Sequence, residues 1–252
     1  MITVVNKKGI IKSYSYFHSK TISLRDIFRV SFYGNFIGAT PKKSVFFWKN
    51  YYHSLHINLL LDENELYKGL KSNTRNEVNR AVNASCVFVE NISTEEFVEF
   101  YNLFAAKKGL KPINTNSLTK YGENLKITGV SMSGEILTLH AYYTDIESGF
   151  TTLLYSASKR LDNIDDSLLK LIGYSNRFLH YQDILYFKKE GFLVYDFGGI
   201  YLGQEDRSQV GIAQFKKSFG GEVVKIVNYL SYPYLCSLRL MSFFEKIDVY
   251  II

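Results

Sequence analysis

The sequence predicts an α/β (α+β) protein with a mixed, mostly antiparallel sheet flanked by helices. Three consecutive segments, 125–132, 136–144 and 150–156, are expected to be strands, because short turns containing Ser and Gly separate them as in β-hairpins. A long helix, a short buried strand and a second helix follow between Ile164 and Gly221. Antiparallel strands that lead into a helix and a further strand are typical of mixed sheets covered by helices.

The N-terminal part gives weaker signals. Strand fragments are predicted at 10–11, 27–30 and 45–48, with Gly and Pro between them. The alternating segment 53–59 predicts a complete strand. We therefore expect one domain over residues 1–252, in which residues 1–54 are an N-terminal extension or a reduced first unit.

One helix is predicted after residue 61, because Asp62 and Glu65 have the spacing of a capping box. Its apolar face is expected to contain Tyr67, Leu70, Thr74, Val78 and Ala81. A strand over 86–90, a helix from Ser93 to about Gly109 and a polar loop over 112–120 complete this part.

The long helix is expected to start at an Asn163 N-cap and to stop at Gly191. It has an apolar stripe and, almost opposite, a second stripe that is largely polar. The second stripe consists of Gly173, Asn176, His180 and Asp183. An apolar strand, 192–195, and the glycine turn Gly198-Gly199 follow the helix.

Composition narrows the class of protein. The chain has 252 residues, 46% of them hydrophobic, which is enough for a substantial core. Cys86 and Cys236 stand alone and are expected to be buried free thiols, so neither a disulfide framework nor a metal site is predicted. Residues 1–21 do not resemble a signal peptide, which indicates a cytoplasmic protein.

The net charge of +6 favours an anionic partner such as CoA, a nucleotide sugar, RNA or a lipid surface.

Three enzyme classes are excluded by missing motifs. Asp196-Phe197-Gly198 spells the metal motif of kinases, but no glycine-rich loop and no His-Arg-Asp loop accompany it. The phosphate loop of NTPases and the nucleophile elbow of serine hydrolases are also missing.

Three segments in order resemble the FemAB-like branch of the GNAT acyltransferase superfamily. That branch carries a Lys-x-x-Gly helix end, a Tyr-Asp-(apolar)-Gly-Gly strand end and a Phe-Lys-x-x-Phe-Gly segment. The corresponding residues are Lys188 to Gly191, Tyr195 to Gly199, and Phe215 to Gly220. The resemblance covers about residues 135–225. It implies a GNAT-like fold and an N-acyltransferase that moves an acyl group from acyl-CoA to an amine on a sugar or amino-acid acceptor, in cell-envelope or surface-polysaccharide biosynthesis.

Two histidines are candidates for accepting the amine proton. His180 has Asn176 one turn before it and Asp183 one turn after it, and a carboxylate there can orient an imidazole. His140 is the polar exception in an apolar strand. The alternatives are a solvated helix face for His180 and a hydrogen-bonded core histidine for His140.

Further residues are candidates for holding the acceptor. Asp196 ends a strand beside Gly198 and Gly199, where it either binds an amine or braces the turn. The resemblance implies that Lys216 points at the reacting carbonyl, where an ammonium offsets oxyanion charge. The remaining candidate substrate-binding residues are Asn176, Asp183, Tyr195 and Arg75, the last on a basic helix face that is usually just solvated.

The donor is expected at the junction before the long helix. Small and basic residues near a helix N-terminus suit phosphate groups, and Ser156, Ser158, Lys159 and Arg160 lie there. The glycine-rich pyrophosphate pattern of GNAT enzymes is missing from this junction. The expected partners are acyl-CoA as donor and a small-molecule or nucleotide-linked sugar as acceptor, without a metal.

Two other functions stay open at this point. The resemblance also implies aminoacyl-tRNA-dependent transfer of the Fem type, with tRNA as partner. A non-catalytic basic module that binds nucleic acid or contacts an anionic membrane is the third hypothesis.

Overall fold

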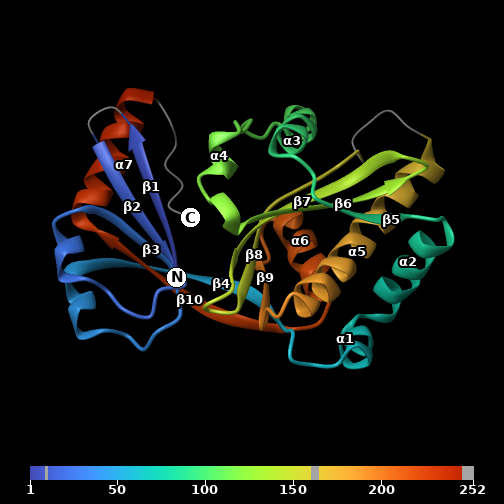
Figure 1. The fold of residues 1–252 in the computed structure, drawn as a ribbon, viewed down its shortest axis with the longest axis horizontal. Helices are drawn as coiled ribbons and strands as arrows, with labels where there is room; N and C mark the ends of the chain where they lie inside the picture. Colours follow the sequence, from blue (N-terminus) through green and yellow to red (C-terminus); the bar gives the residue numbers. More distant parts are fainter. Residues whose placement is uncertain (9–10, 160–164, 246–252) are drawn as a thin grey trace. The chain divides into compact units, whose positions relative to one another are not determined.

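The computed structural model describes residues 1–8, 11–159 and 165–245, which form two compact units (Figure 1). Unit 1 consists of Met1–Tyr52 and Lys225–Ile252, and unit 2 of His53–Val224. The chain enters unit 2 within strand β4 (Phe47–Asn58) and returns to unit 1 within β10 (Glu222–Ser231).

Unit 2 contains the predicted mixed, mostly antiparallel sheet. Its strand order is β4-β9-β8-β7-β6-β5, and neighbours are antiparallel except β8 and β9, which are parallel. The three strands predicted between 125 and 156 are confirmed with small changes at their ends. The bounds are β5 Val87–Glu90, β6 Leu125–Met132, β7 Glu135–Asp145, β8 Phe150–Ser158 and β9 Val194–Gly199.

Helices cover both faces of this sheet, as Figure 1 shows for α3 (Thr94–Lys108) and α5 (Asp166–Lys189). Side chains alternate along β7, so Leu139 packs in a cluster with α3 whereas His140 contacts α5. The shorter helices are α1 (Glu63–Gly69), α2 (Ser72–Asn83), α4 (Asn116–Thr119) and α6 (Arg207–Lys217), with a 3-10 turn, η3, at Gly122–Asn124.

The single helix predicted after residue 61 is two helices. Leu70 and Lys71 are extended and separate α1 from α2. The Leu70 side chain is buried in the core, and the Lys71 N–H donates to the carbonyl of Ser218 instead of a helical carbonyl. Tertiary contacts therefore interrupt a continuous helical pattern. The capping box of Asp62 and Glu65 is confirmed.

Helix α5 begins later than predicted. Its N-cap is Asp165, whose carboxylate accepts from the N–H groups of Ser167 and Leu168. The predicted cap, Asn163, lies outside the described residues. The helix ends as expected before Gly191, which has a φ of +88°. The strand predicted from residue 192 starts at Val194, because the N–H groups of Leu193 and Val194 both donate to the Gly149 carbonyl.

Unit 1 has a four-stranded sheet in the order β1-β2-β3-β10, in which β2 and β3 are parallel. Two predicted strand fragments are confirmed only in part. Of 27–30, Ile27 ends a 3-10 turn and Val30 begins a strand. Of 45–48, Val45 and Phe46 belong to a second 3-10 turn, whereas Phe47 and Trp48 begin β4. Of the fragment 10–11, Ile11 begins β2. The elements are β1 Ile2–Lys8, β2 Ile11–Phe17, η1 Leu24–Ile27, β3 Val30–Phe36, η2 Lys42–Phe46 and α7 Tyr232–Glu245.

Both cysteines are free thiols. Cys86 is buried as expected, but Cys236 is exposed on α7, so the prediction of two buried thiols is wrong for Cys236. None of the helices in the described part of the chain combines the length and apolar character that crossing a bilayer requires.

Candidate active site

A buried polar cluster lies between β7 and α5. Nδ1 of His140 is 2.8 Å from Oδ2 of Asp183, and Nε2 is 3.0 Å from Oδ1 of Asn176. Both ring nitrogens of His140 therefore have a hydrogen-bond partner, which fixes the orientation of the ring. Asp183 is completely buried, so its carboxylate needs hydrogen-bond partners of this kind.

Asp183 is held by three donors from two neighbouring strands, β6 and β7. Besides His140, it accepts from Thr128 Oγ1 on β6 at 2.6 Å and from the Tyr142 hydroxyl on β7 at 2.5 Å. The buried carboxylate is therefore fully hydrogen-bonded, which a charge in this position requires.

A chain of hydrogen bonds fixes the tautomer of His180. A carboxylate only accepts, so the Tyr142 hydroxyl uses its proton on Asp183. The Tyr195 hydroxyl, 2.8 Å away, must then donate to Tyr142. Nδ1 of His180 is 2.9 Å from the Tyr195 oxygen and must in turn donate to it. The lone pair of His180 is therefore on Nε2.

The electrostatic surroundings keep His180 neutral. Burial lowers the pKa of His180 well below 6.5, and the positive charges of His140, Lys216 and Arg177 lower it further. The same environment raises the pKa values of Tyr142 and Tyr195 well above 10, mainly by burial, so both remain phenols. His180 is thus an uncharged imidazole with an unprotonated Nε2.

A cavity of about 590 Å³ adjoins this cluster, and His180 and Asn176 form part of its wall. His140 is fully buried behind them and does not line the cavity. The wall contains three cationic side chains and, among the described residues, no Asp or Glu. The cations are Lys108, Arg177 and Lys216, and the apolar part of the wall is Phe104, Leu153, Ile172, Phe197, Ile212 and Phe215.

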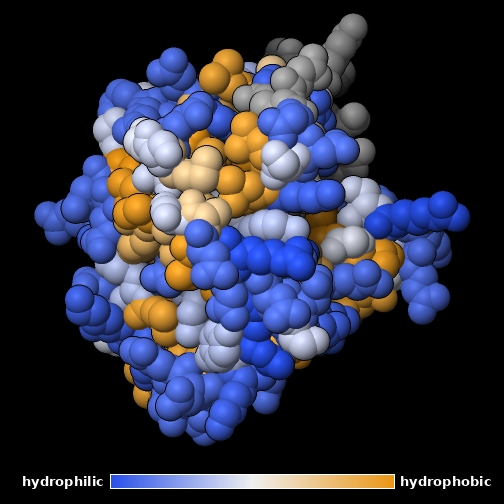
Figure 2. Space-filling model, turned by 90° about the vertical axis from the view of Figure 1, so that its right-hand side faces the viewer, coloured by the Kyte–Doolittle hydropathy of each residue, from blue (hydrophilic) through white to orange (hydrophobic). Residues whose placement is uncertain are grey.

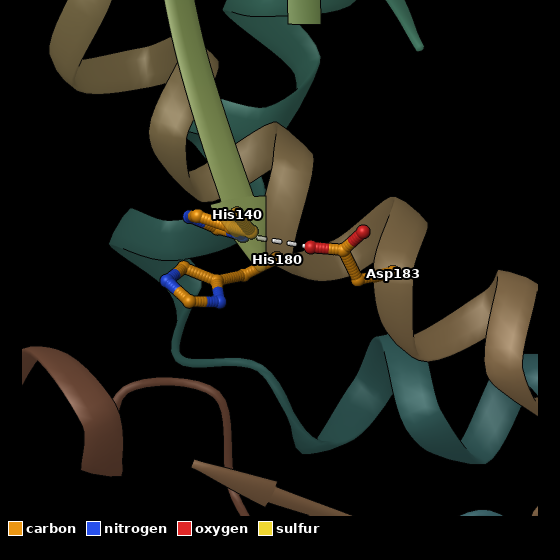
Figure 3. A group of neighbouring side chains, drawn as sticks. All are labelled: His140, His180 and Asp183. Carbon is orange, nitrogen blue, oxygen red and sulfur yellow. Dashed lines mark hydrogen bonds and ion pairs between the residues drawn. The ribbon is translucent and has the colours of Figure 1, made fainter. Parts of the chain in front are cut away.

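His140, His180 and Asp183 are also close enough to approach a metal ion together (Figure 3). The two imidazole rings lie against each other, with centroids 4.1 Å apart. The nearest ligand atoms are already engaged, because Asp183 accepts three hydrogen bonds and Nδ1 of His180 donates to Tyr195.

Asp196 lies apart from the histidines. Residues alternate along β9, so Tyr195 and Phe197 face His180 whereas Asp196 faces the other side of the sheet. Its carboxylate accepts from Ser54, from Thr152 Oγ1 at 3.2 Å and from the N–H of Gly198 at 2.8 Å. His56 Nε2 is 3.6 Å away. Asp196 is buried and does not line the cavity.

Lys216 joins the glycine turn to the cavity. Its ammonium donates to the carbonyls of Phe197, at 2.9 Å, and Gly199, at 2.7 Å, and its side chain lines the cavity. Burial lowers the pKa of Lys216, while the negative charge of Asp196 raises it. The turn itself depends on Gly198, whose φ is +71°.

The remaining predicted residues are distributed unevenly. Ser156 and Ser158, at the end of β8, line the cavity, whereas the Lys159 ammonium pairs with Glu135 at 2.5 Å. Arg160 lies outside the described residues. Arg75 donates to the carbonyls of Lys68 and Leu70 at the end of α1 and does not line the cavity. Figure 2 shows the side of the molecule at the right of Figure 1, where hydrophilic residues predominate.

Sequence reasoning missed Thr128, Tyr142 and Arg177. Tyr142 is two residues after His140 and therefore shares its strand face, which is a signal that alternation provides. Arg177 follows Asn176 directly, and its guanidinium pairs with Glu77 at 2.8 Å and lies over the Phe215 ring. Thr128 is one of several threonines in the strands, and nothing in the sequence distinguishes it.

Comparisons with known proteins identify the fold. Neither a scan against protein-family models nor a search of curated proteins gives a match. The solved structure of FemX is similar with a TM-score of 0.66 and 11% identity, over 94% of this chain and 85% of FemX. The C-terminal domain assigned to a lysylphosphatidylglycerol synthetase from Agrobacterium fabrum gives 0.60 and 11%, over 99% and 86%. L-PGS from Bacillus licheniformis gives 0.53 and 8%, over 97% and 85%. These similarities confirm the predicted FemAB-like fold of the GNAT branch.

Proposed function

We propose that the chain is an N-acyltransferase in which His180 is the general base. The observation that supports this most directly is the one-way hydrogen-bond chain from His180 through Tyr195 and Tyr142 to Asp183. It holds the proton on Nδ1 and leaves the lone pair on Nε2 of a side chain that lines the cavity. A neutral imidazole with an available lone pair is what aminolysis of an activated acyl group needs from a general base.

The reaction forms one bond and breaks one. The acceptor amine attacks the carbonyl carbon of the acyl donor, which forms the C–N bond and places negative charge on the carbonyl oxygen. Nε2 of His180 takes the proton from the attacking nitrogen. The intermediate then collapses and breaks the bond to the leaving group, which receives that proton. The Lys216 ammonium, in the cavity wall, offsets the charge on the oxygen.

The charge of the cavity wall supports an acyl-CoA donor over an aminoacyl ester. An aminoacyl group carries an ammonium next to the reacting carbonyl, and a cavity normally holds such a group with a carboxylate. The described wall has Lys108, Arg177 and Lys216 but no acidic side chain. Cationic walls suit a phosphate-bearing donor with an uncharged acyl group.

The other residues receive supporting roles. His140 and Asp183 position the cluster from behind, and Asn176 contributes an amide to the cavity wall. Ser156 and Ser158 line the donor side. Asp196 stabilises the glycine turn of Gly198 and Gly199 by accepting three hydrogen bonds. We place the acceptor amine on a sugar or amino acid of the cell envelope, as the resemblance of residues 135–225 to the FemAB-like branch implies. The compartment we propose is the cytoplasm, where free thiols stay reduced.

Release of the donor thiol tests the proposal. The purified protein is incubated with short-chain acyl-CoA thioesters and a panel of amino sugars, nucleotide-linked amino sugars and amino acids. Amine-dependent release of CoA is expected, and it is expected to fall in His180→Gln. Because Cys236 is exposed, its thiol would react with the reagent that detects CoA, so the assay uses the Cys236→Ser variant as the parent protein.

Thermal-shift titration separates the alternatives. Stabilisation by CoA supports the proposed donor. Stabilisation by aminoacyl-tRNA and not by CoA would replace it with transfer of the Fem type. No acyl transfer with either donor would leave the non-catalytic basic module as the better account.

A further inference from the structure

Two 3-10 turns of unit 1 expose large apolar side chains to solvent. In η1 and its C-cap these are Leu24 and Phe28, and in η2 and the start of β4 they are Val45, Phe46 and Trp48. Each is at least half exposed, and Phe28 is 85% exposed. Neighbouring apolar residues, Ile27 and Phe47, pack into the same core cluster, so the turns are anchored on a common base. Figure 1 shows both turns at the left of unit 1.

The exposed charges of the two turns are all positive. Arg25 lies in η1, and Lys42 and Lys43 lie in η2. The one carboxylate nearby, Asp26, is turned inward, where it is 2% exposed and accepts from the Tyr33 hydroxyl at 2.5 Å. Residues 1–52 as a whole contain nine lysines and arginines and only this one acidic residue.

We propose that this turn surface, formed by Leu24, Arg25, Phe28, Lys42, Lys43, Val45, Phe46 and Trp48, docks on an anionic lipid bilayer. Aromatic and aliphatic side chains are stabilised when they move from water to the boundary between headgroups and acyl chains. Flanking cations are attracted to anionic lipids. Trp is a preferred residue at that boundary. A nucleic acid fits the cations and aromatic rings, but it offers the aliphatic Leu24 and Val45 no apolar phase.

The chain carries its own probe for this proposal. Trp48 is its single tryptophan and belongs to the turn surface. The full-length protein is titrated with vesicles of phosphatidylcholine alone and with an equal mixture of phosphatidylcholine and phosphatidylglycerol. The mixed vesicles are expected to shift Trp48 emission to shorter wavelength and to carry the protein down in sedimentation. Added salt is expected to weaken both effects.

Two sets of variants separate docking from general hydrophobicity. Phe28→Ser combined with Phe46→Ser is expected to reduce partition onto the mixed vesicles at least about tenfold. Lys42→Ala and Lys43→Ala are each expected to reduce it about fivefold. The matched control, Leu60→Ser with Leu103→Ser, removes equally exposed apolar side chains from unit 2 and is expected to leave partition unchanged.

Three outcomes would overturn the proposal. One is no emission shift with the mixed vesicles while circular dichroism shows a folded protein. The second is an equal loss of partition in the control pair. The third is a shift produced by single-stranded nucleic acid, or by raising the protein concentration, but not by vesicles, which would assign the surface to nucleic acid or to a second copy. Acyl transfer to a water-soluble amine is independent of all three outcomes, so this proposal and the proposed function can fail separately.

Discussion

The hydroxyl of Tyr195 lies 2.8 Å from the hydroxyl of Tyr142, and this contact sets the direction of proton donation through the site. Because Tyr142 donates to Asp183, Tyr195 has to donate to Tyr142, and His180 in turn has to donate to Tyr195. A carboxylate on α5 thereby controls a histidine one turn earlier on the same helix through two strands of the sheet. The relay runs through tyrosines that are too deeply buried to ionise.

Replacing Tyr195 by phenylalanine is expected to uncouple His180 from this chain. The Nδ1–H then lacks its acceptor, so the ring is no longer held with its lone pair on Nε2. We expect kcat to fall about tenfold with little change in KM, because the variant loses only a part of the rate acceleration that a general base provides. Steady-state kinetics measures this. Tyr186→Phe, which removes a hydroxyl from a ring beside the same apolar cluster, is the control. Equal kinetics for both variants would contradict the relay.

Replacing His180 by glutamine removes the proposed base and keeps a polar side chain of similar reach. The expected loss in kcat is about 100- to 10,000-fold. Single-turnover measurements of acyl transfer give this number without interference from product release. His140→Gln is expected to act through position and stability, because His140 does not reach the cavity. A larger rate loss in His140→Gln than in His180→Gln would shift the role of base to His140.

His180 also predicts how stability depends on pH. Its pKa is depressed by burial and neighbouring charge in the folded state, whereas in the unfolded chain it is near 6.5. Below 6.5 the unfolded state binds a proton that the folded state does not, so the free energy of unfolding falls as the pH drops from 6.5 toward the folded pKa. Above 6.5 this contribution is complete. Urea denaturation between pH 5 and pH 8 is the measurement. His180→Phe is expected to have a shallower slope in the acidic part of that range.

Local patterns account for the elements that the sequence predicted well. The strands between 125 and 156 follow from the short turns that separate them, such as Ser133-Gly134, where both residues have positive φ. The neighbours Asn176, His180 and Asp183 follow from helical spacing on α5. The pairing of His140 with Asp183 does not follow from local spacing, because it depends on which face of β7 packs against α5.

Other differences come from tertiary contacts. The break at Leu70 is set by a carbonyl of Ser218, which lies far along the chain. The side of the sheet that Asp196 occupies could be predicted, because alternation separates it from Tyr195 and Phe197. The turns of unit 1 have no period at all, so their exposed apolar residues resemble strand fragments in the sequence.

Asp196→Asn is expected to cost more stability than rate. An amide cannot accept all the hydrogen bonds that Ser54, Thr152 and the Gly198 N–H donate to the carboxylate. Loss of charge-assisted hydrogen bonds of this kind lowers the free energy of unfolding by about 1.5–3 kcal/mol. Chemical denaturation measures the loss, and kinetics well below the melting temperature is expected to show kcat within about threefold of the parent protein. A rate loss of 100-fold without a change in stability would assign Asp196 to the acceptor amine.

Lys216 has two roles that a pair of variants can separate. Its charge lowers the pKa of His180, and its ammonium, in the cavity wall, is proposed to offset the charge on the reacting carbonyl oxygen. Lys216→Met removes both effects. The acid limb of the kcat profile is therefore expected to move to higher pH, because His180 is protonated more easily, and the plateau at high pH is expected to fall about 10- to 100-fold.

Lys216→Arg keeps the charge near His180 but alters the reach of the donor group. It is expected to leave the acid limb in place while the plateau still falls. A shift of the acid limb in both variants, or a plateau unchanged in Lys216→Met, would show that Lys216 only clamps the carbonyls of Phe197 and Gly199. Thermal denaturation of the two variants measures how much this clamp stabilises the protein, because the clamp connects α6 to the end of β9.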